Sequence, residues 1–353
     1  MKKRTAITVT IAAIVLTALA AVAAYDYYRT FYADNVSDSR DSDVLRIYRN
    51  YSYQQMLDSL KSSGILTDFR TFERAAGHME LATSFKPGYY VFDSVMSNKD
   101  IVRMIANCWQ KPVKVTIRGY IRSLEKFASI LGTKFEADSA SFAKVLTDRE
   151  VMRSYEFEEE SFIGMFIPNT YEFFWTASPE EFVDRMNKEY MSFWTDERKA
   201  KAEDVGMTQK EVSTLAAIVI SETKYVPEMP TIAGVYINRL RKGIPLQADP
   251  TVLFALNQKG IRRVLNKHLK VDSPYNTYIN KGLPPGPITM PSIESLDAVL
   301  NYQKHNYIYF CARETFDGRH NFASTLSGHM ANARAYHRAL NAKEREKALS
   351  KQK

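Results

Sequence analysis

The pattern of hydrophobic and polar positions divides the chain into segments, and the first segment is the most apolar. Residues 5–24 carry no charge and follow a basic cluster at residues 2–4. An apolar run of about 20 residues is long enough to cross a bilayer as a helix, and basic residues before it favour a cytoplasmic N-terminus. We therefore expect a basic stub and transmembrane anchor over residues 1–25, with a cleaved signal peptide as the alternative. The polar residues 26–43 are expected to form a tether.

Between residues 44 and 120 the pattern alternates between short strands and short helices. Capping boxes that begin at Ser52 and Ser97 predict the starts of two helices. The runs 86–92 and 113–117 are rich in aromatic and β-branched residues and predict strands. Together these signals indicate a small α+β module.

Residues 121–205 are expected to form a helical linking region, with one helix over 120–146 and another over 180–201. Between these helices, residues 161–175 are rich in aromatic side chains and are interrupted by glycine and proline. This stretch is interpreted as a buried linking strand. The alternative is one wall of a sugar-binding groove, because aromatic faces pack well on sugar rings.

The region from 206 to 340 is predicted to be mainly helical. A capping box at Thr208 and Glu211 opens one helix, and a turn at 317–318 between strands expected over 306–312 and 319–322 predicts a short β-hairpin. Residues 341–353 are expected to be a charged tail. The predicted fold class is therefore α+β, with a single N-terminal transmembrane helix, a small α+β module and a mainly helical C-terminal domain.

Glu222 is the strongest candidate for a catalytic residue. It lies seven residues after Leu215 and three after Val219, so its carboxyl falls on the apolar face near the C-terminal end of the predicted helix. Loss of hydration and the helix dipole both disfavour the charged carboxylate and raise its pKa. A general acid near neutral pH needs such a shift. The alternative is a helix-end glutamate that pairs with Lys224 or Arg239.

Asp249 is the nearest candidate for a second carboxylate. Because Pro250 follows it, Asp249 is predicted to be an N-cap with proline at the first helical position. Gln247 is a polar residue in an apolar setting and is a candidate ligand-binding residue. The stretch 273–288 predicts a stiff, irregular loop of a kind suited to holding a sugar.

Composition and charge narrow the function classes. The content of 45% hydrophobic and 25% charged residues is that of a folded protein. The net charge of +8 suits several anionic partners, but a compartment outside the cytoplasm excludes nucleic acid as the main partner. Cys108 and Cys311 are expected to be free thiols. The two cysteines and six histidines show no metal-binding spacing, so neither a metal nor a cofactor is expected.

Several motifs in register resemble the endolytic murein transglycosylase family, also called MltG or YceG-like. The matching stretches are AAIVISET (216–223), AGVYINRL (233–240), LQADPTV (246–252), YNTY (275–278) and GLPPGPI (282–288). The chain departs from the family pattern at Ile163, Asn169 and Ile220, where acidic residues are common. The resemblance implies that the module at 44–120 is LysM-like and that residues 206–340 form a catalytic transglycosylase domain.

The family's catalytic glutamate falls on Glu222. The resemblance implies an enzyme, a carbon–oxygen lyase that cleaves MurNAc–GlcNAc bonds in nascent peptidoglycan strands and leaves 1,6-anhydroMurNAc ends. A single carboxyl suffices for this reaction, because the C6 hydroxyl of the same sugar replaces an external nucleophile. The residues expected to contact the substrate are Gln247, Asn276, Thr277, Tyr278, Asn169 and Tyr171.

The expected location is the inner membrane, with a single span and a periplasmic catalytic body. The expected partners are glycan strands, the membrane and, as a candidate, a peptidoglycan synthase. Two other functions stay open. One is a two-carboxylate muramidase that uses Glu222 and Asp249, and the other is a non-catalytic glycan-binding scaffold of wall synthesis.

Overall fold

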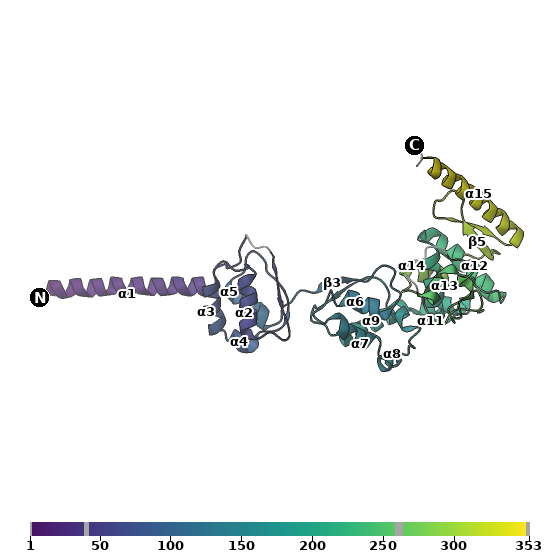
Figure 1. Ribbon diagram of the computed structural model, residues 1–353. Coiled ribbons are helices and arrows are strands. Elements are labelled where there is room, and N and C mark those ends of the chain that lie inside the picture. The colour runs from purple at the N-terminus through teal and green to yellow at the C-terminus, as the bar shows by residue number, and fades with distance from the viewer. Residues whose placement is uncertain (1, 39–41, 258–263, 351–353) are drawn as a thin grey trace. The chain divides into compact units, whose positions relative to one another are not determined.

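The computed structural model describes residues 2–38, 42–257 and 264–350, and the chain forms two compact units. The first unit comprises Met1–Val115, Lys134–Ala137 and Glu172–Ser178. The second comprises Thr116–Thr133, Asp138–Tyr171 and Pro179–Lys353. Figure 1 labels the elements of both units along the chain.

The first unit joins one long helix to a small α+β module. Its elements are α1 (Lys2–Phe31), β1 (Val44–Ile47), α2 (Tyr53–Ser62), α3 (Phe69–His78), α4 (Leu81–Ser84), β2 (Gly88–Val91), α5 (Asn98–Ala106) and, at its end, β3 (Val113–Thr116). β1 and β2 pair antiparallel, from Val44 opposite Val91 to Ile47 opposite Gly88. Both predicted capping boxes, at Ser52 and Ser97, are present. The predicted α+β module is thus confirmed, and its assignment as LysM-like stays a prediction.

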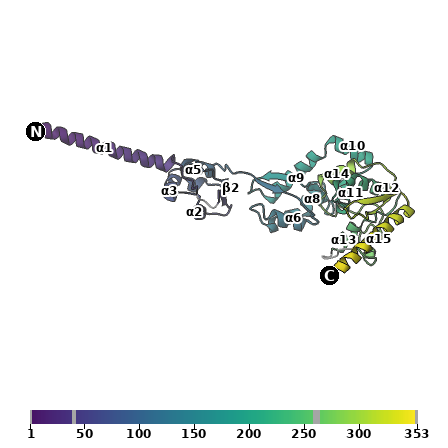
Figure 2. The same cartoon turned by 90° about the horizontal axis from the view of Figure 1, so that it is seen from above.

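Helix α1 has the character of a membrane-spanning helix. Ala6–Phe31 contains an 18-residue window with a mean hydropathy of 2.5, none of it buried inside the protein. Large apolar side chains such as Ile7, Ile14 and Leu16 are more than half exposed. Both views show α1 as one uninterrupted helix (Figures 1 and 2). Its length and composition allow it to cross a bilayer, although an N-terminal signal sequence has the same properties.

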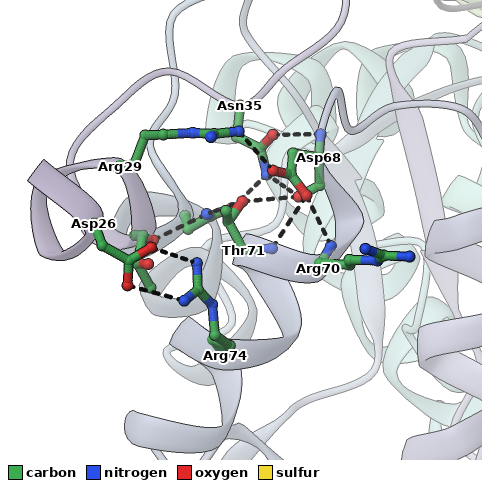
Figure 3. Close-up of polar contacts among 9 residues, drawn as sticks. Asp26, Arg29, Asn35, Asp68, Arg70, Thr71 and Arg74 are labelled. Atoms are coloured by element: carbon green, nitrogen blue, oxygen red, sulfur yellow. Dashed lines mark hydrogen bonds and ion pairs between the residues drawn. The ribbon is translucent and has the colours of Figure 1, made fainter. Parts of the chain in front are cut away.

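The C-terminal end of α1 is fixed to the module, contrary to the first part of the predicted tether over residues 26–43; residues 39–41 of that tether lie outside the described residues. Residues 26–31 continue the helix, because polar partners on α3 hold it there. Asp26 accepts two hydrogen bonds from Arg74, of 2.9 and 3.1 Å, and Arg29 donates to Asp68 at 2.9 Å (Figure 3). These ion pairs are exposed and contribute little stability individually.

A buried amide makes the stronger connection. Asn98, at the first position of α5, is completely buried. Its Nδ2 donates to the Thr30 carbonyl at 2.9 Å and to the Thr71 hydroxyl at 3.1 Å, and its Oδ1 accepts from Asn35 at 2.6 Å. Removing a partner from buried polar groups costs their desolvation free energy. Asn98 is therefore the residue that ties the end of α1 to both α3 and α5.

We expect Asn98→Ala to lower the protection free energy of the α3 amides by roughly 2 kcal/mol, because the Thr30 carbonyl and the Asn35 amide lose their partner. Hydrogen exchange of the full chain in detergent micelles measures this. The matched control is Gln54→Ala, which removes an exposed amide that donates to Asp58, and it should change protection by less than about 0.5 kcal/mol. Equal effects of the two substitutions would contradict the role of Asn98.

The second unit is mainly helical. Its elements are α6 (Leu124–Leu131), α7 (Ser139–Leu146), α8 (Arg149–Ser154), η1 (Phe162–Met165), β4 (Thr170–Phe173, which runs into the first unit), α9 (Pro179–Phe193), α10 (Asp196–Val205), α11 (Gln209–Glu222), η2 (Val226–Glu228), α12 (Met229–Arg241), α13 (Asp249–Leu256), η3 (His268–Lys270), α14 (Ile293–Leu300), β5 (Tyr309–Ala312), β6 (His320–Ala323) and α15 (Leu326–Ser350). Helix α11 is central and contacts α10, α12, α13, α14 and η1.

Two predicted helices are each divided in the structure. The segment 120–146 forms α6 and α7, because Asp138 caps the second helix by accepting from Ser141 at 2.8 Å. The segment 180–201 belongs to α9 and α10, because Thr195 caps α10 by accepting from the amide of Arg198. The predicted hairpin is confirmed: β5 and β6 pair antiparallel, from Tyr309 opposite Ala323 to Ala312 opposite His320.

Candidate active site

Helix α11 places Glu222 at the edge of a pocket. The Thr208–Glu211 capping box is present, and Leu215 and Val219 are fully buried against neighbouring helices, as predicted. Glu222 is the last residue of the helix, one turn beyond Val219, and its side chain is only partly exposed. The helix phase inferred from the sequence is therefore confirmed.

The pocket has a volume of about 500 Å³. It is formed by the ends of α11 and α12, the segment before α13, the β5–β6 hairpin and the start of α15. The polar residues that line it are Glu222, Tyr236, Arg239, Gln247, Asp249, Tyr278, Tyr309, His320 and His329. All of these belong to the second unit.

The carboxyl of Glu222 has an unusual electrostatic setting. Burial, together with the negative charge of Asp249, raises the pKa of Glu222 to about 7, against the opposing effect of a hydrogen bond from Tyr236. The Tyr236 hydroxyl donates to Oε1 of Glu222 at 2.6 Å. Among the described residues Glu222 forms no ion pair, so the predicted alternative of a pair with Lys224 or Arg239 is wrong. The raised pKa favours the protonated, acid form of Glu222 at a higher pH than for an ordinary glutamate.

Asp249 does not have the helix-capping role that its sequence predicted. The residue that caps α13 is Ala248, without a side-chain hydrogen bond, and Asp249 occupies the first helical position. The Asp249 carboxylate instead accepts from the Tyr278 hydroxyl at 2.6 Å and lines the same pocket as Glu222. The prediction of a capping role was wrong because a tyrosine 29 residues later in the chain competes for the carboxylate. The pocket therefore contains two carboxyl groups.

Arg239 and Gln247 form a hydrogen-bonded part of the pocket wall. The Arg239 guanidinium is buried and donates to the carbonyls of Pro245 and Ile308, at 2.9 and 2.8 Å, and to the Gln247 side chain. Gln247 has a φ of +53°, a backbone conformation that costs free energy for a residue with a side chain and is concentrated at functional sites. These contacts keep Gln247 at the pocket, where the sequence analysis expected it.

The other predicted substrate-binding residues fall into two groups. Tyr278 lines the pocket, through its bond to Asp249. Asn276 and Thr277 are buried and bond within the protein: Asn276 donates to the carbonyls of Leu269 and Val271, and Thr277 accepts from the Ala248 amide at 3.0 Å. The Asn276 side chain holds the loop that carries Tyr278, and the Thr277 side chain joins this loop to the segment that carries Gln247.

Asn169 and Tyr171 do not line the pocket of Glu222. Asn169 borders another cavity of about 510 Å³, together with Tyr120 and Lys224. The Tyr171 side chain is buried, and its hydroxyl donates to the Ile167 carbonyl at 2.6 Å. Their expected part in substrate binding stays a prediction that the pocket geometry does not support.

Tyr236 and the histidines of the pocket were not predicted as site residues. Tyr236 lies within an apolar helical run, where its side chain is expected to be buried. A buried tyrosine hydroxyl needs a hydrogen-bond partner, and this requirement is the sequence signal that could have identified Tyr236 as a site residue. His320 is held by Glu228, whose Oε2 lies 2.8 Å from Nδ1; no local pattern predicts a contact between residues 92 positions apart. His329 stacks on Tyr309, and burial lowers its pKa.

Among the described residues no cluster of histidine, cysteine or acidic side chains is arranged to hold a metal ion.

The sequence model of the YceG-like family matches residues 45–335 of the chain, which covers the pocket of Glu222 and most of both units. The chain belongs to the YceG-like family. The resemblance drawn from the motifs is thus confirmed.

Relatives of this YceG-like chain are named endolytic murein transglycosylases. One, from Bacillus subtilis, is 38% identical over 167 residues, which are 47% of this chain and 45% of that protein. Another, from Streptococcus pneumoniae, is 25% identical over 336 residues, which are 84% of this chain and 58% of that protein. The chain thus spans about half the length of these relatives. A crystal structure of a YceG-like protein from Listeria monocytogenes is 26% identical, with a TM-score of 0.55, and covers 82% of this chain and 97% of that one.

The raised pKa of Glu222 predicts a pH-dependent cost in stability. The folded-state pKa is about 7 against an ordinary 4.5, so the stability contributed by the protonated form is complete below pH 4.5 and is lost as the pH rises through 7. Glu222→Gln stays neutral and should gain roughly 1–3 kcal/mol over the wild type at pH 8 and almost nothing at pH 4.5.

Denaturant unfolding at both pH values measures this difference. Glu203→Gln, an exposed glutamate of α10, is the matched control and should show no pH-dependent gain. A gain for Glu222→Gln of the same size at pH 4.5 and pH 8 would contradict the raised pKa.

Proposed function

We propose that this YceG-like protein is an endolytic peptidoglycan transglycosylase with Glu222 as its general acid and base. The observation that carries the proposal is a carboxyl with a pKa of about 7 at the edge of a pocket of about 500 Å³. Ligand pockets commonly have volumes of roughly 300–1,000 Å³, so this pocket is large enough for a small part of a glycan strand. The names of the relatives supply the substrate class.

The reaction needs a proton donor first and a proton acceptor afterwards. The protonated Glu222 gives its proton to the glycosidic oxygen between MurNAc and GlcNAc as the bond from C1 to that oxygen breaks. The Glu222 carboxylate then takes the proton of the MurNAc C6 hydroxyl, and O6 bonds to C1. The products are a 1,6-anhydroMurNAc end and a GlcNAc end, and Glu222 is again protonated. A group with a pKa near 7 suits both steps.

Asp249 has an electrostatic role in this scheme. As C1 loses its leaving group, positive charge develops on C1 and the ring oxygen, and a fixed carboxylate stabilises that charge. The bond from Tyr278 keeps the Asp249 carboxylate in the pocket, and Arg239 fixes Gln247 beside it. Tyr278 and Gln247 are the groups that we expect to orient the sugar.

The position of Asp249 also favours a second candidate function. An ordinary glycosidase uses two carboxyl groups in one pocket, and the second of them activates water or acts as the nucleophile. A muramidase that uses Glu222 and Asp249 is therefore the alternative. The proposal prefers the transglycosylase because the relatives carry that name.

The proposed location follows from α1. Its exposed apolar surface is suited to a bilayer, and the basic residues 2–4 favour a cytoplasmic N-terminus. The α+β module that follows α1 and the second unit would then lie in the periplasm. The module, if it is LysM-like, would bind glycan near the membrane, where newly made strands and a peptidoglycan synthase are expected.

Digestion of purified glycan strands tests the proposal. The wild type should release fragments with 1,6-anhydroMurNAc ends from the interior of strands, as read by mass spectrometry, and Glu222→Gln should be at least about 1,000-fold slower, because it cannot donate a proton. Glu203→Gln is the control and should be fully active. Reducing MurNAc ends would support the muramidase, and no cleavage by the wild type would support a binding scaffold.

The pH profile of kcat/KM tests the contacts of Glu222. Activity should fall above about pH 7, where the free enzyme loses the acid proton. Asp249→Asn removes a negative neighbour and lowers the pKa of Glu222, so the alkaline limb moves to lower pH. Tyr236→Phe removes a donor to the carboxylate and moves that limb to higher pH, which separates the two variants by roughly one pH unit.

The control is Asp272→Asn, an exposed aspartate outside the pocket, which should leave the alkaline limb unchanged. If the alkaline limbs of Asp249→Asn and Tyr236→Phe moved in the same direction, or neither moved, Glu222 would not be the group that titrates.

A further inference from the structure

A second pocket adjoins the catalytic one within the same unit. Its volume is about 640 Å³. It shares Glu222, Ala312 and His320 with the catalytic pocket and extends along the loop of the β5–β6 hairpin. A ligand group that is attached to a sugar beside Glu222 therefore has a neighbouring cavity to enter.

Three cationic side chains line this second pocket. Lys224 is exposed and has no ion pair among the described residues. Arg313 donates through Nε to the His320 carbonyl at 3.0 Å and has no carboxylate partner in the described part of the chain. Arg319 pairs with Asp317 at 2.8 Å. The pocket thus keeps more positive charge than its own aspartate neutralises.

Aromatic side chains complete the walls of the second pocket. Tyr225 is 44% exposed and lies under the Arg319 guanidinium, with 5.7 Å between the guanidinium carbon and the ring centroid. Phe316 has a φ of +53° and packs on Tyr336 at 5.6 Å between ring centroids. A positive φ is rare for a bulky residue and is maintained only where surrounding structure compensates for its strain. The hairpin loop is therefore held in one conformation, in which Phe316, Arg313 and Arg319 line the second pocket.

His320 connects the two pockets. The buried carboxylate of Glu228 lies 2.8 Å from its Nδ1 and accepts from its backbone amide at 3.1 Å. Its Nε2 has no hydrogen-bond partner among the described residues and is not a buried atom. The imidazole is thus fixed at the border between the sugar pocket and the cationic one, with a ring nitrogen open to a ligand.

We propose that the second pocket, lined by Lys224, Arg313 and Arg319, binds the carboxylates of the peptide stem that a MurNAc unit carries. This inference rests on the proposed function, because it places a MurNAc beside Glu222. The sugar backbone of a stem-bearing strand is neutral, and its negative charges lie on the peptides. Cations in a cavity that opens beside the acid therefore match the stem rather than the sugars.

The experiment compares two forms of one substrate. Uncrosslinked strands with free stem carboxylates are tested beside the same strands whose carboxylates have been converted to amides, which keeps their size and removes their charge. The wild type should prefer the acidic form by about tenfold in kcat/KM, as expected from one or two charge-assisted hydrogen bonds. Lys224→Ala and Arg319→Gln should each bring this ratio closer to one.

The control is Lys242→Ala, which removes an exposed lysine of the same unit outside both pockets and should keep the ratio. A wild-type ratio of one, with both strands cut, would overturn this inference and leave the proposed function intact. An equal loss of the ratio in Lys242→Ala would show general charge attraction and would also overturn it.

A binding measurement separates the two proposals if no strand is cut. Fluorescence anisotropy with a labelled muramoyl peptide should show weaker binding to Lys224→Ala than to the wild type, and weaker binding of the amidated probe to the wild type. Such a result without cleavage would contradict the proposed function and support the pocket. Equal binding of both probes to the wild type would overturn the pocket, whatever the activity.

Discussion

The carboxyl of Glu222 lies between interactions that change its pKa in opposite directions. Burial at the end of α11 removes water from it, and the negative charge of Asp249 adds to the cost of ionisation. The Tyr236 hydroxyl, 2.6 Å away, favours the ionised form. The balance gives a pKa of about 7. A cation in place of the Tyr236 hydroxyl would keep Glu222 ionised at neutral pH. A fully apolar setting would raise its pKa so far that it could not give up its proton.

The rest of the pocket maintains this balance. Arg239 carries a positive charge only one helical turn from Tyr236, but its guanidinium is engaged by two carbonyls and by Gln247. The guanidinium therefore bonds groups in the wall of the pocket and forms no ion pair with Glu222 among the described residues. Asn276 bonds inside the loop that carries Tyr278, and Thr277 joins that loop to the Ala248 amide before α13. Tyr278 in turn holds Asp249. The irregular segment around Tyr278 therefore fixes the position of the Asp249 carboxylate in the pocket.

The features that could be predicted from the sequence are those set by neighbouring residues. The capping boxes at Ser52, Ser97 and Thr208 and the helix phase of Glu222 depend on contacts within three or four positions, and all are present. The resemblance to the YceG-like family was recognisable because its motifs are long and keep their order.

The features that the sequence did not reveal depend on distant partners. Asp249 has the pattern of a helix cap, but Tyr278 competes for its carboxylate. Residues 26–31 look like a polar tether, but they form the end of a helix that the buried Asn98 holds through the Thr30 carbonyl, with exposed ion pairs to Arg74 and Asp68 beside it. Side chains such as that of Asn276 suit a sugar or a loop carbonyl equally well, and only the fold decides which one they bind.

The central claim is that Glu222 holds a proton near neutral pH. A carbon-13 NMR titration of the protein labelled at the glutamate side-chain carboxyl carbons measures this directly, with Glu222→Gln used to assign the signal. The account predicts one carboxyl that titrates with a midpoint near 7 and is absent from the variant. A midpoint for Glu222 near the ordinary value of 4.5 would contradict it.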